Sequence, residues 1–267
     1  MSSRAPIPVF EHPIIETHCH LDYLKEQTQS VIDNASNVGV ERIITISVSP
    51  DNLETVRTLT QEHETVWGTQ GVHPHDADQF EASVLSTIKH NLQAHPDKLI
   101  AVGEIGLDYF YDKSDRNRQL DAFSQQLELA AELNLPVVIH TREADKDMQS
   151  VLSEHSEHLQ RKGVIHSFTS GQALAEFCLS EGFYLGFNGI STFKKAQNVR
   201  DIIRITPLEQ IVLETDSPYL TPVPYRGKEN APKYLPFIAQ QVAECKDVPI
   251  EMCLTQCHQN SMALFFN

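Results

Sequence analysis

Six side chains of metal-binding types stand at or just beyond the ends of short apolar runs in this 267-residue chain. His18 and His20 belong to one such run, which begins at Ile14. Residues at i and i+2 of a strand point to the same face, so both imidazoles could bind one ion. The other four side chains each end a separate run, and together the six indicate an enzyme with a metal centre. The candidate ligands are His18, His20, Glu104, His140, His166 and Asp216.

Four imidazoles and two carboxylates suit two ions better than one. Zinc in proteins takes about four ligands of these types, and a catalytic site leaves one position to water. Glu104 lies near the middle of the set and is the natural bridge between ions, whereas Asp216 suits a ligand that also orients water. Two divalent ions can clamp the attacking and leaving oxygens of a phosphodiester and lower the pKa of bound water to about 7. The predicted chemistry is hydrolysis by metal-activated water, with Glu104 and Asp216 as catalytic residues.

The runs that carry these residues are typical of buried parallel strands separated by amphipathic helices. Leu120, Phe123 and Leu127, for example, repeat at helical spacing. Eight strand–helix units predict one domain over residues 1–267, a closed (β/α)8 TIM barrel with a binuclear metal site at its C-terminal mouth. Strands are predicted at residues 14–19, 42–48, 66–71, 99–104, 136–140, 163–166, 183–187 and 210–214, and helices at 28–39, 51–63, 81–95, 117–134, 143–159, 172–181 and 194–204.

Composition and charge narrow the classes of function. Hydrophobic residues make up 40% of the chain and charged residues 21%, which is ordinary for a globular protein. No apolar run approaches the ~18 residues of a membrane span, and no signal-peptide core follows Met1, so a cytoplasmic protein is expected. The net charge of −15 opposes tight, sequence-specific binding to duplex DNA. Two divalent ions would offset part of that charge at the site itself.

The five cysteines are not expected to form a disulfide framework, because their number is odd and their positions are scattered. Cys253 and Cys257 lie one helical turn apart and could bind a soft metal. They also fit the buried stripe of a C-terminal helix that contains Ile250 and Leu254, and this interpretation is favoured. Cys19 lies between the two ligand histidines, so strand alternation turns it away from their face.

Short motifs accompany these residues in a fixed order along the chain. They are THCHLD at 17–22, GVHP at 71–74, GEIGLDY at 103–109, VIHTR at 138–142, HSF at 166–168, FNGI at 187–190, ETDSPYL at 214–220 and RGKEN at 226–230. With this ordered set the chain resembles the TatD family of metal-dependent deoxyribonucleases, within the amidohydrolase-like metal barrels. The resemblance runs from about residue 12 to the C-terminus.

The resemblance implies a divalent-metal-dependent DNase activity, often exonucleolytic. It also implies metal binding by the six candidate ligands named above. The chain departs from the family pattern at Glu16, where Asp is common, and at Ser167, where Cys is common. Neither position is a ligand, so we expect metal binding to survive both changes.

Five further residues are candidate contacts for the substrate. His73 would contact a phosphate, transfer a proton or bind a third ion, although it could simply cap a loop beside Pro74. Arg142 could offer a bidentate fork to a phosphate or pair with a neighbouring carboxylate. Tyr109 would stack on an unpaired base or pack at the barrel rim. Arg226 and Lys228 lie in a proline-rich loop that is expected to cover the mouth. They could bind a nucleic-acid backbone or form ion pairs within the loop.

Three other residues near the predicted strand ends are given a structural role or no single role. His75 is expected to be structural, and Asp108 is expected to cap a helix or pair within a loop. Phe193 could stack on a base, but packing at the rim is nearly as well supported.

The predicted reaction is cleavage of DNA, at single-stranded or frayed ends, because a concave mouth admits one strand more easily than a duplex. Its cofactors would be two divalent cations: His-rich ligation suits Zn, whereas phosphodiester cleavage often uses Mg or Mn. No membrane and no obligate protein partner are expected. One alternative is an amidohydrolase acting on a C–N or lactone bond, in which a carboxylated Lys commonly stands where Glu104 is found. A non-catalytic partner-binding barrel is the other, and the complete ligand set argues against it.

Overall fold

Eight parallel strands, each paired with the next along the chain, form a barrel in the computed structural model, which describes residues 4–267. The predicted (β/α)8 barrel is therefore confirmed. The strands are β1 (Ile14–Cys19), β2 (Val40–Thr45), β3 (Val66–Gln70), β4 (Leu99–Asp108), β5 (Val137–Arg142), β6 (Gly163–Ile165), β7 (Tyr184–Phe187) and β8 (Ile211–Leu213).

The end of β1 closes the barrel against the segment that follows β8. Cys19 and Ser217 form a parallel bridge. The backbone N–H of Asp216 donates to the carbonyl of His18 at 2.9 Å, and that of His20 donates to the carbonyl of Ser217 at 2.8 Å. This seam fixes three of the six candidate ligands relative to one another through main-chain hydrogen bonds.

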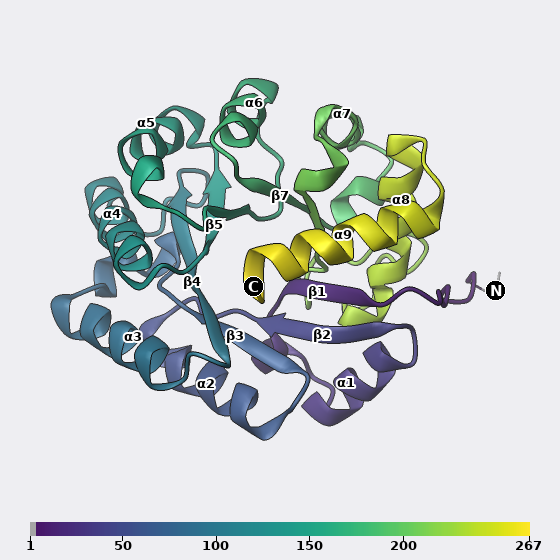
Figure 1. Cartoon of the computed structure of the whole chain (residues 1–267), viewed down its shortest axis with the longest axis horizontal. Coiled ribbons are helices and arrows are strands. Elements are labelled where there is room, and N and C mark those ends of the chain that lie inside the picture. The colour runs from purple at the N-terminus through teal and green to yellow at the C-terminus, as the bar shows by residue number, and fades with distance from the viewer. Residues whose placement is uncertain (1–3) are drawn as a thin grey trace.

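Helices surround the barrel on its outside (Figure 1). All seven helices predicted between the strands are present, with ends that differ by a few residues from the predicted ones. No helix within residues 4–267 is both long enough and apolar enough to cross a membrane. The helices are α1 (Thr28–Ser36), α2 (Leu53–Glu62), α3 (Ala82–Ala94), α4 (Arg116–Leu133), α5 (Asp145–His155), α6 (Gln172–Ser180), α7 (Gln197–Ile205), α8 (Leu235–Lys246) and α9 (Ile250–Phe265).

Helix α4 illustrates how local sequence sets an element. Its N-cap is Asp115, whose carboxylate accepts the backbone N–H groups of Asn117 and Arg118. The apolar stripe that includes Phe123 is buried against the barrel. The helix ends at Asn134, which adopts a left-handed conformation with φ of 52°.

The interior of the barrel is closed at one end by helix α9. Leu264 and Phe265, at the end of α9, join strand residues in an apolar cluster that includes Ile44, Val138 and Val212. Figure 1 shows α9 lying across the barrel, with the C-terminus over the ring of strands. The other end of the barrel is left open for the site.

The C-terminal cysteines are packing residues, as predicted. Cys253 and Cys257 of α9 are buried in the main apolar core, and Cys19 is also fully buried. Helix α8, in contrast, is absent from the sequence prediction. Eight of its twelve residues are buried, so its polar face is narrow and the periodicity that reveals a helix in a sequence is weak.

Strand β4 is longer than predicted, and its extension matters for the site. The prediction ended at Glu104, but all ten residues through Asp108 are buried, and the pairing with β5 continues to Arg142. Gly106 permits this, because a Cβ at its position would lie 2.0 Å from the carbonyl oxygen of His140. The extension carries Asp108 to the mouth of the barrel.

Candidate metal centre

The end of β1 supplies two buried imidazoles. His18 is 1% exposed and His20, one residue past the strand, is 5% exposed. The Nε2 atoms of both face Oδ1 of Asp216, at 3.7 Å and 3.5 Å. Cys19, between them, points away from this face, with its thiol toward the carbonyl of Ile44. The i, i+2 spacing therefore places the two rings as the sequence predicted.

Glu104 of β4 lies at the centre of a ring of imidazoles. Its Oε1 is 2.8 Å from Nε2 of His166, 3.2 Å from Nδ1 of His140 and 3.4 Å from Nε2 of His73. Its Oε2 faces the other way, 3.3 Å from Nε2 of His18. One carboxylate thus joins two sets of nitrogens, the arrangement that a bridging ligand requires.

Three groups of side chains within residues 4–267 have ligand atoms close enough to hold an ion. Glu104 belongs to two of them, and His18 also belongs to two. The groups are His18, His20 and Glu104; His73, Glu104 and His140; and His18, His166 and Glu214.

The hydrogen bonding of these rings also fits cation binding. Within residues 4–267, both ring nitrogens of His18, both of His166 and Nδ1 of His20 are buried and form no hydrogen bond of good geometry, although Oε1 of Glu104 lies 2.8 Å from Nε2 of His166. The rings of His18 and His166 are stacked, with centroids 3.8 Å apart. Buried polar atoms are normally paired, so this concentration of bare nitrogen donors fits the ligand set of a divalent metal.

The pKa values of these groups are shifted by burial and by the short distances between carboxylates and imidazoles. Burial alone would raise the pKa of Glu104, but the imidazoles of His166, His73 and His18 hold it well below its usual value. Burial would lower the pKa of His166, but the carboxylates of Glu104 and Glu214 raise it well above the usual value. Burial lowers the pKa of His18 and, more strongly, that of His73. These directions favour an ionised Glu104 beside a protonated His166, and a cation bound there would replace the proton of His166.

Asp108 has a larger part in the site than the sequence suggested. Its Oδ1 accepts the backbone N–H groups of Phe110 and Tyr111, which is the predicted pairing within a loop. Its Oδ2 lies 2.9 Å from Nε2 of His140 and 2.9 Å from Nε2 of His75. His75, predicted to be structural, thus shares a fully buried carboxylate with a candidate ligand. The contact fixes the ring of His140 so that its Nδ1 faces Glu104.

Glu214 is a second carboxylate that the sequence prediction did not assign to the site. It is fully buried, and its Oε1 is 3.5 Å from Nδ1 of His166. Gly186 leaves room for it, since a Cβ there would lie 2.4 Å from Oε2 of Glu214. Glu214 and Asp216 are two residues apart, the spacing already used for His18 and His20, and this signal could have indicated the residue.

A cavity of about 800 Å³ opens at this end of the barrel, and both candidate metal residues and rim residues line it. Among the predicted substrate contacts, His73 and Arg142 line the cavity. Lys113, which the sequence prediction did not single out, also lines it. The candidate ligands in the lining are His20, Glu104, His140, His166 and Asp216.

The other three predicted substrate contacts lie outside this lining. The hydroxyl of Tyr109 donates to Oδ2 of Asp147 at 2.7 Å, so its ring is directed toward α5. The guanidinium of Arg226 lies 3.7 Å from the ring centroid of Phe193. Lys228 is exposed on the loop after β8, where its N–H donates to the carbonyl of Tyr225.

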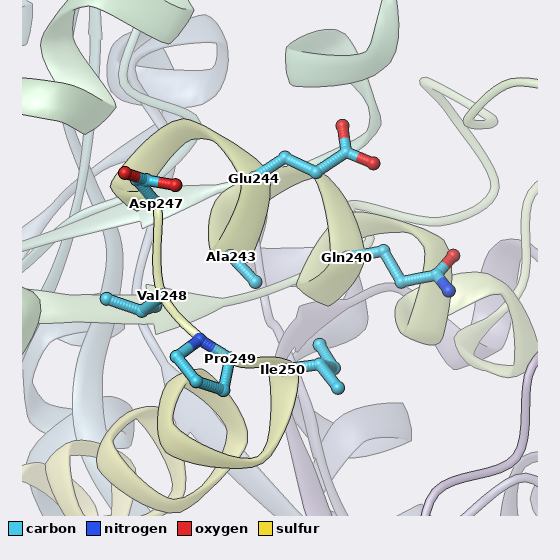
Figure 2. A pocket seen from close by; sticks show the side chains of 7 residues that line it. All are labelled: Gln240, Ala243, Glu244, Asp247, Val248, Pro249 and Ile250. Atoms are coloured by element: carbon cyan, nitrogen blue, oxygen red, sulfur yellow. The ribbon is translucent and has the colours of Figure 1, made fainter.

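A separate depression lies at the corner between α8 and α9, lined by side chains that include Glu244 and Asp247 but no histidine (Figure 2). Its volume is about 530 Å³. Because it contains none of the candidate ligands, it is not the metal centre.

Comparison with known proteins adds a family context. The family described as "TatD related DNase" matches residues 15–266. A Bacillus subtilis protein named as the uncharacterized metal-dependent hydrolase YabD is 35% identical over 254 residues, covering 94% of this chain and 98% of the relative.

Two further relatives extend the comparison to function and structure. The 3'-5' ssDNA/RNA exonuclease TatD of Erwinia amylovora is 33% identical over 241 residues, covering 88% of this chain and 92% of its own. The crystal structure of YJJV, a TatD homolog from Escherichia coli K12, superimposes with a TM-score of 0.89 at 30% identity. It covers 94% of this chain and 97% of that chain.

Proposed function

The chain belongs to the TatD-related DNase family of metal-dependent hydrolases, and from this premise we propose that it hydrolyses phosphodiester bonds of single-stranded DNA with two divalent cations. The observation that carries the proposal is the position of Glu104, whose two oxygens face different sets of imidazoles. The name of the Erwinia relative, a 3'-5' ssDNA/RNA exonuclease, supports the same substrate class.

Six residues would hold the two cations: His18, His20, Glu104, His140, His166 and Asp216. Glu104 would be shared between the ions, and zinc, manganese and magnesium are the candidates. When bound, the cations supply a hydroxide nucleophile at neutral pH and positive charge for the phosphate oxygens.

Asp216 and Glu104 differ in access to solvent, and this divides their roles. Both side chains line the cavity, but that of Asp216 is 14% exposed, whereas that of Glu104 is 4% exposed. Asp216 is therefore the carboxylate that an attacking water can reach, and it would accept the proton of that water. His73, 3.4 Å from Glu104, and Arg142 line the same cavity and would contact the phosphate.

Exposed aromatic side chains around the mouth favour a single strand over a duplex. Tyr23, Tyr111 and Tyr219 line the cavity and are 41%, 60% and 53% exposed. Phe110, beside Tyr111, is 50% exposed. Aromatic faces of this kind stack on unpaired bases without regard to sequence, and bases inside a duplex cannot reach them. Tyr111 takes the stacking role that the sequence prediction gave to Tyr109.

We expect the metal-loaded protein to cleave single-stranded DNA faster than the same sequence in a duplex. Because stacking contributes about 1–3 kcal/mol per base, Tyr111→Leu should raise KM for the single strand about tenfold and change kcat little. Steady-state kinetics on matched single-stranded and duplex oligonucleotides measures both effects. Tyr184→Leu, at the opposite end of the barrel on β7, is the matched control. Equal rates on both substrates, or equal KM values in the two variants, would remove the aromatic rim from substrate binding.

Asp108→Asn should lower turnover about 10- to 100-fold, the usual cost of losing an outer-shell partner of a metal ligand. The amide can still accept the N–H groups of Phe110 and Tyr111, but it replaces the anionic partner of His140. Phosphodiesterase activity and bound metal would be measured together, with the exposed Asp112→Asn as control. Wild-type turnover and metal affinity in Asp108→Asn would show that the contact to His140 is only structural.

A further inference from the structure

A second cavity of about 720 Å³ adjoins the mouth of the barrel, between the loops that follow β5, β6 and β7. It shares Arg142, Thr169 and Ile190 with the mouth cavity, so the two are continuous. We call this second cavity the side groove, and its lining residues are Arg142, Glu143, Asp145, Thr169, Ser170, Ile190, Phe193, Lys195, Ala196, Asn198 and Val199.

We propose that the side groove binds the nucleotides of a single-stranded DNA that lie beyond the scissile phosphate. This inference rests on the proposed function, because the strand is placed by the phosphate at the metal centre. It adds a second binding site, and apart from Arg142 and Ile190 its lining residues belong neither to the family motifs nor to the metal centre.

The groove contains an aromatic surface held in a fixed position. Phe193 lines it and is half-buried, and the guanidinium of Arg226 packs on its ring. Arg200 of α7 holds the loop that follows β7. Its Nη1 donates to the carbonyls of Ser191 and Phe193, at 2.9 Å and 2.8 Å. Thr192 ties the same loop to the one after β8, since its Oγ1 accepts the N–H of Val223. A ring held this way is suited to stacking on a base at low entropic cost.

The charges around the mouth favour a path of the single-stranded DNA through the side groove. Arg142 and Lys195 line the groove, and Arg226 stands beside it. Glu143 and Asp145 also line it and balance these two cations, so the excess positive charge beside the groove comes from Arg226. Phosphates attract such cations even within an acidic chain.

The opposite rim of the mouth carries mixed charges. Asp76 and Lys113 both line the mouth cavity there, and the pKa of Asp76 is raised by burial while His75 and Lys113 act to lower it. A phosphate on this path would meet Asp76 beside Lys113, whereas the side groove has Arg226 next to its lining, so a strand whose scissile phosphate lies at the metals has the side groove as its more favourable route.

The remaining lining groups suit a sugar-phosphate backbone of any sequence. Thr169 and Ser170 offer hydroxyl groups and Asn198 offers an amide, all at least partly accessible. Hydroxyl and amide donors bind phosphate and sugar oxygens without reading bases. Together with a stacking ring and two cations, they form the combination found in sequence-tolerant single-strand sites.

Lys195→Glu tests the groove, and Lys194→Glu is its matched control. Lys194 is the adjacent exposed lysine and lies outside the lining of both cavities. The substrates are a ten-nucleotide single-stranded DNA and bis(p-nitrophenyl) phosphate, which is too short to reach the groove. The measurement is the ratio of kcat/KM on the DNA to kcat/KM on the small ester, in manganese-loaded protein.

We expect this ratio to fall about tenfold in Lys195→Glu and to stay at the wild-type value in Lys194→Glu. The salt slope for binding of a phosphorothioate ten-mer should become shallower by about 0.7, the value for one phosphate contact on a single strand. Phe193→Leu, which keeps the apolar bulk but loses the stacking face, should also lower the ratio. An equal ratio in Lys195→Glu and Lys194→Glu would contradict the binding of single-stranded DNA in the side groove.

Failure of the groove can be told apart from failure of the proposed function. Wild-type cleavage of DNA with no specific effect of Lys195→Glu would leave the function standing and reject the groove. Binding of the ten-mer that depends on Lys195 in a protein that does not cleave DNA would reject the function and keep the groove. Absence of both binding and cleavage would reject both.

Discussion

Glu104→Gln is expected to abolish phosphodiester hydrolysis while leaving the barrel folded. The carboxylate faces four imidazoles through two oxygens, and an amide carries no charge to share between two cations. Losing an outer-shell partner costs about 10- to 100-fold, so losing a shared ligand should cost more than about 100-fold. Turnover of a DNA oligonucleotide and metal content by elemental analysis should fall together, and circular dichroism should stay unchanged.

Glu132→Gln is the control for this variant, because Glu132 is exposed on α4 and pairs with Lys89. It should keep full activity and full metal content. Wild-type turnover with full metal occupancy in Glu104→Gln would remove Glu104 from the mechanism, whatever the behaviour of the control.

Removal of metal is expected to eliminate activity and to destabilise the fold. Without cations, the ring nitrogens of His18 and His166 stay buried without a hydrogen bond of good geometry, and the imidazoles crowd one another. At metal concentrations about 100 times Kd, binding to the native state alone stabilises it by about 2.7 kcal/mol. For a domain of this size, that corresponds to a rise in Tm of about 5–10 °C.

Thermal unfolding of chelated and metal-reconstituted protein measures this effect. The matched control is a variant without a metal-site change, Glu132→Gln, which should show the same rise. A Tm that does not respond to zinc, manganese or magnesium would contradict tight binding at the cluster.

The grouping of the candidate ligands could be predicted from sequence because each of them follows a run of strand type. In a parallel barrel the carboxyl ends of all strands meet at one mouth, so residues 18 and 216 become neighbours without any local signal between them. The i, i+2 rule then fixed which face of β1 carries the two imidazoles. Both steps depend only on strand geometry, and strand geometry is regular.

Asp108 and Glu214, the carboxylates that contact the candidate histidine ligands, were harder to predict. Asp108 belongs to β4 only because Gly106 allows close approach to β5, and its contact with His140 spans 32 residues of sequence. Glu214 was missed because a buried Glu in an apolar run carries no signal by itself, and only its spacing of two residues from Asp216 points to it. Such contacts depend on packing between strands, which a single sequence does not display.

Rim residues were the least predictable, because a shift of one or two positions in a loop changes their direction. Tyr109 turns to Asp147, whereas Tyr111 faces the cavity. Arg226 packs on Phe193 instead of entering the mouth. Lys113 and Lys195 line the two cavities, although neither belongs to a motif.

The most direct measurement is hydrolysis of end-labelled single-stranded DNA by protein that has been chelated and then reconstituted with zinc, manganese or magnesium. Small amides and lactones are assayed in parallel with the same preparations. We predict shortened DNA products only in the reconstituted samples, and a kcat/KM for DNA well above that for any amide or lactone. Metal-dependent cleavage of the amides or lactones with no cleavage of DNA would contradict the nuclease and favour an amidohydrolase.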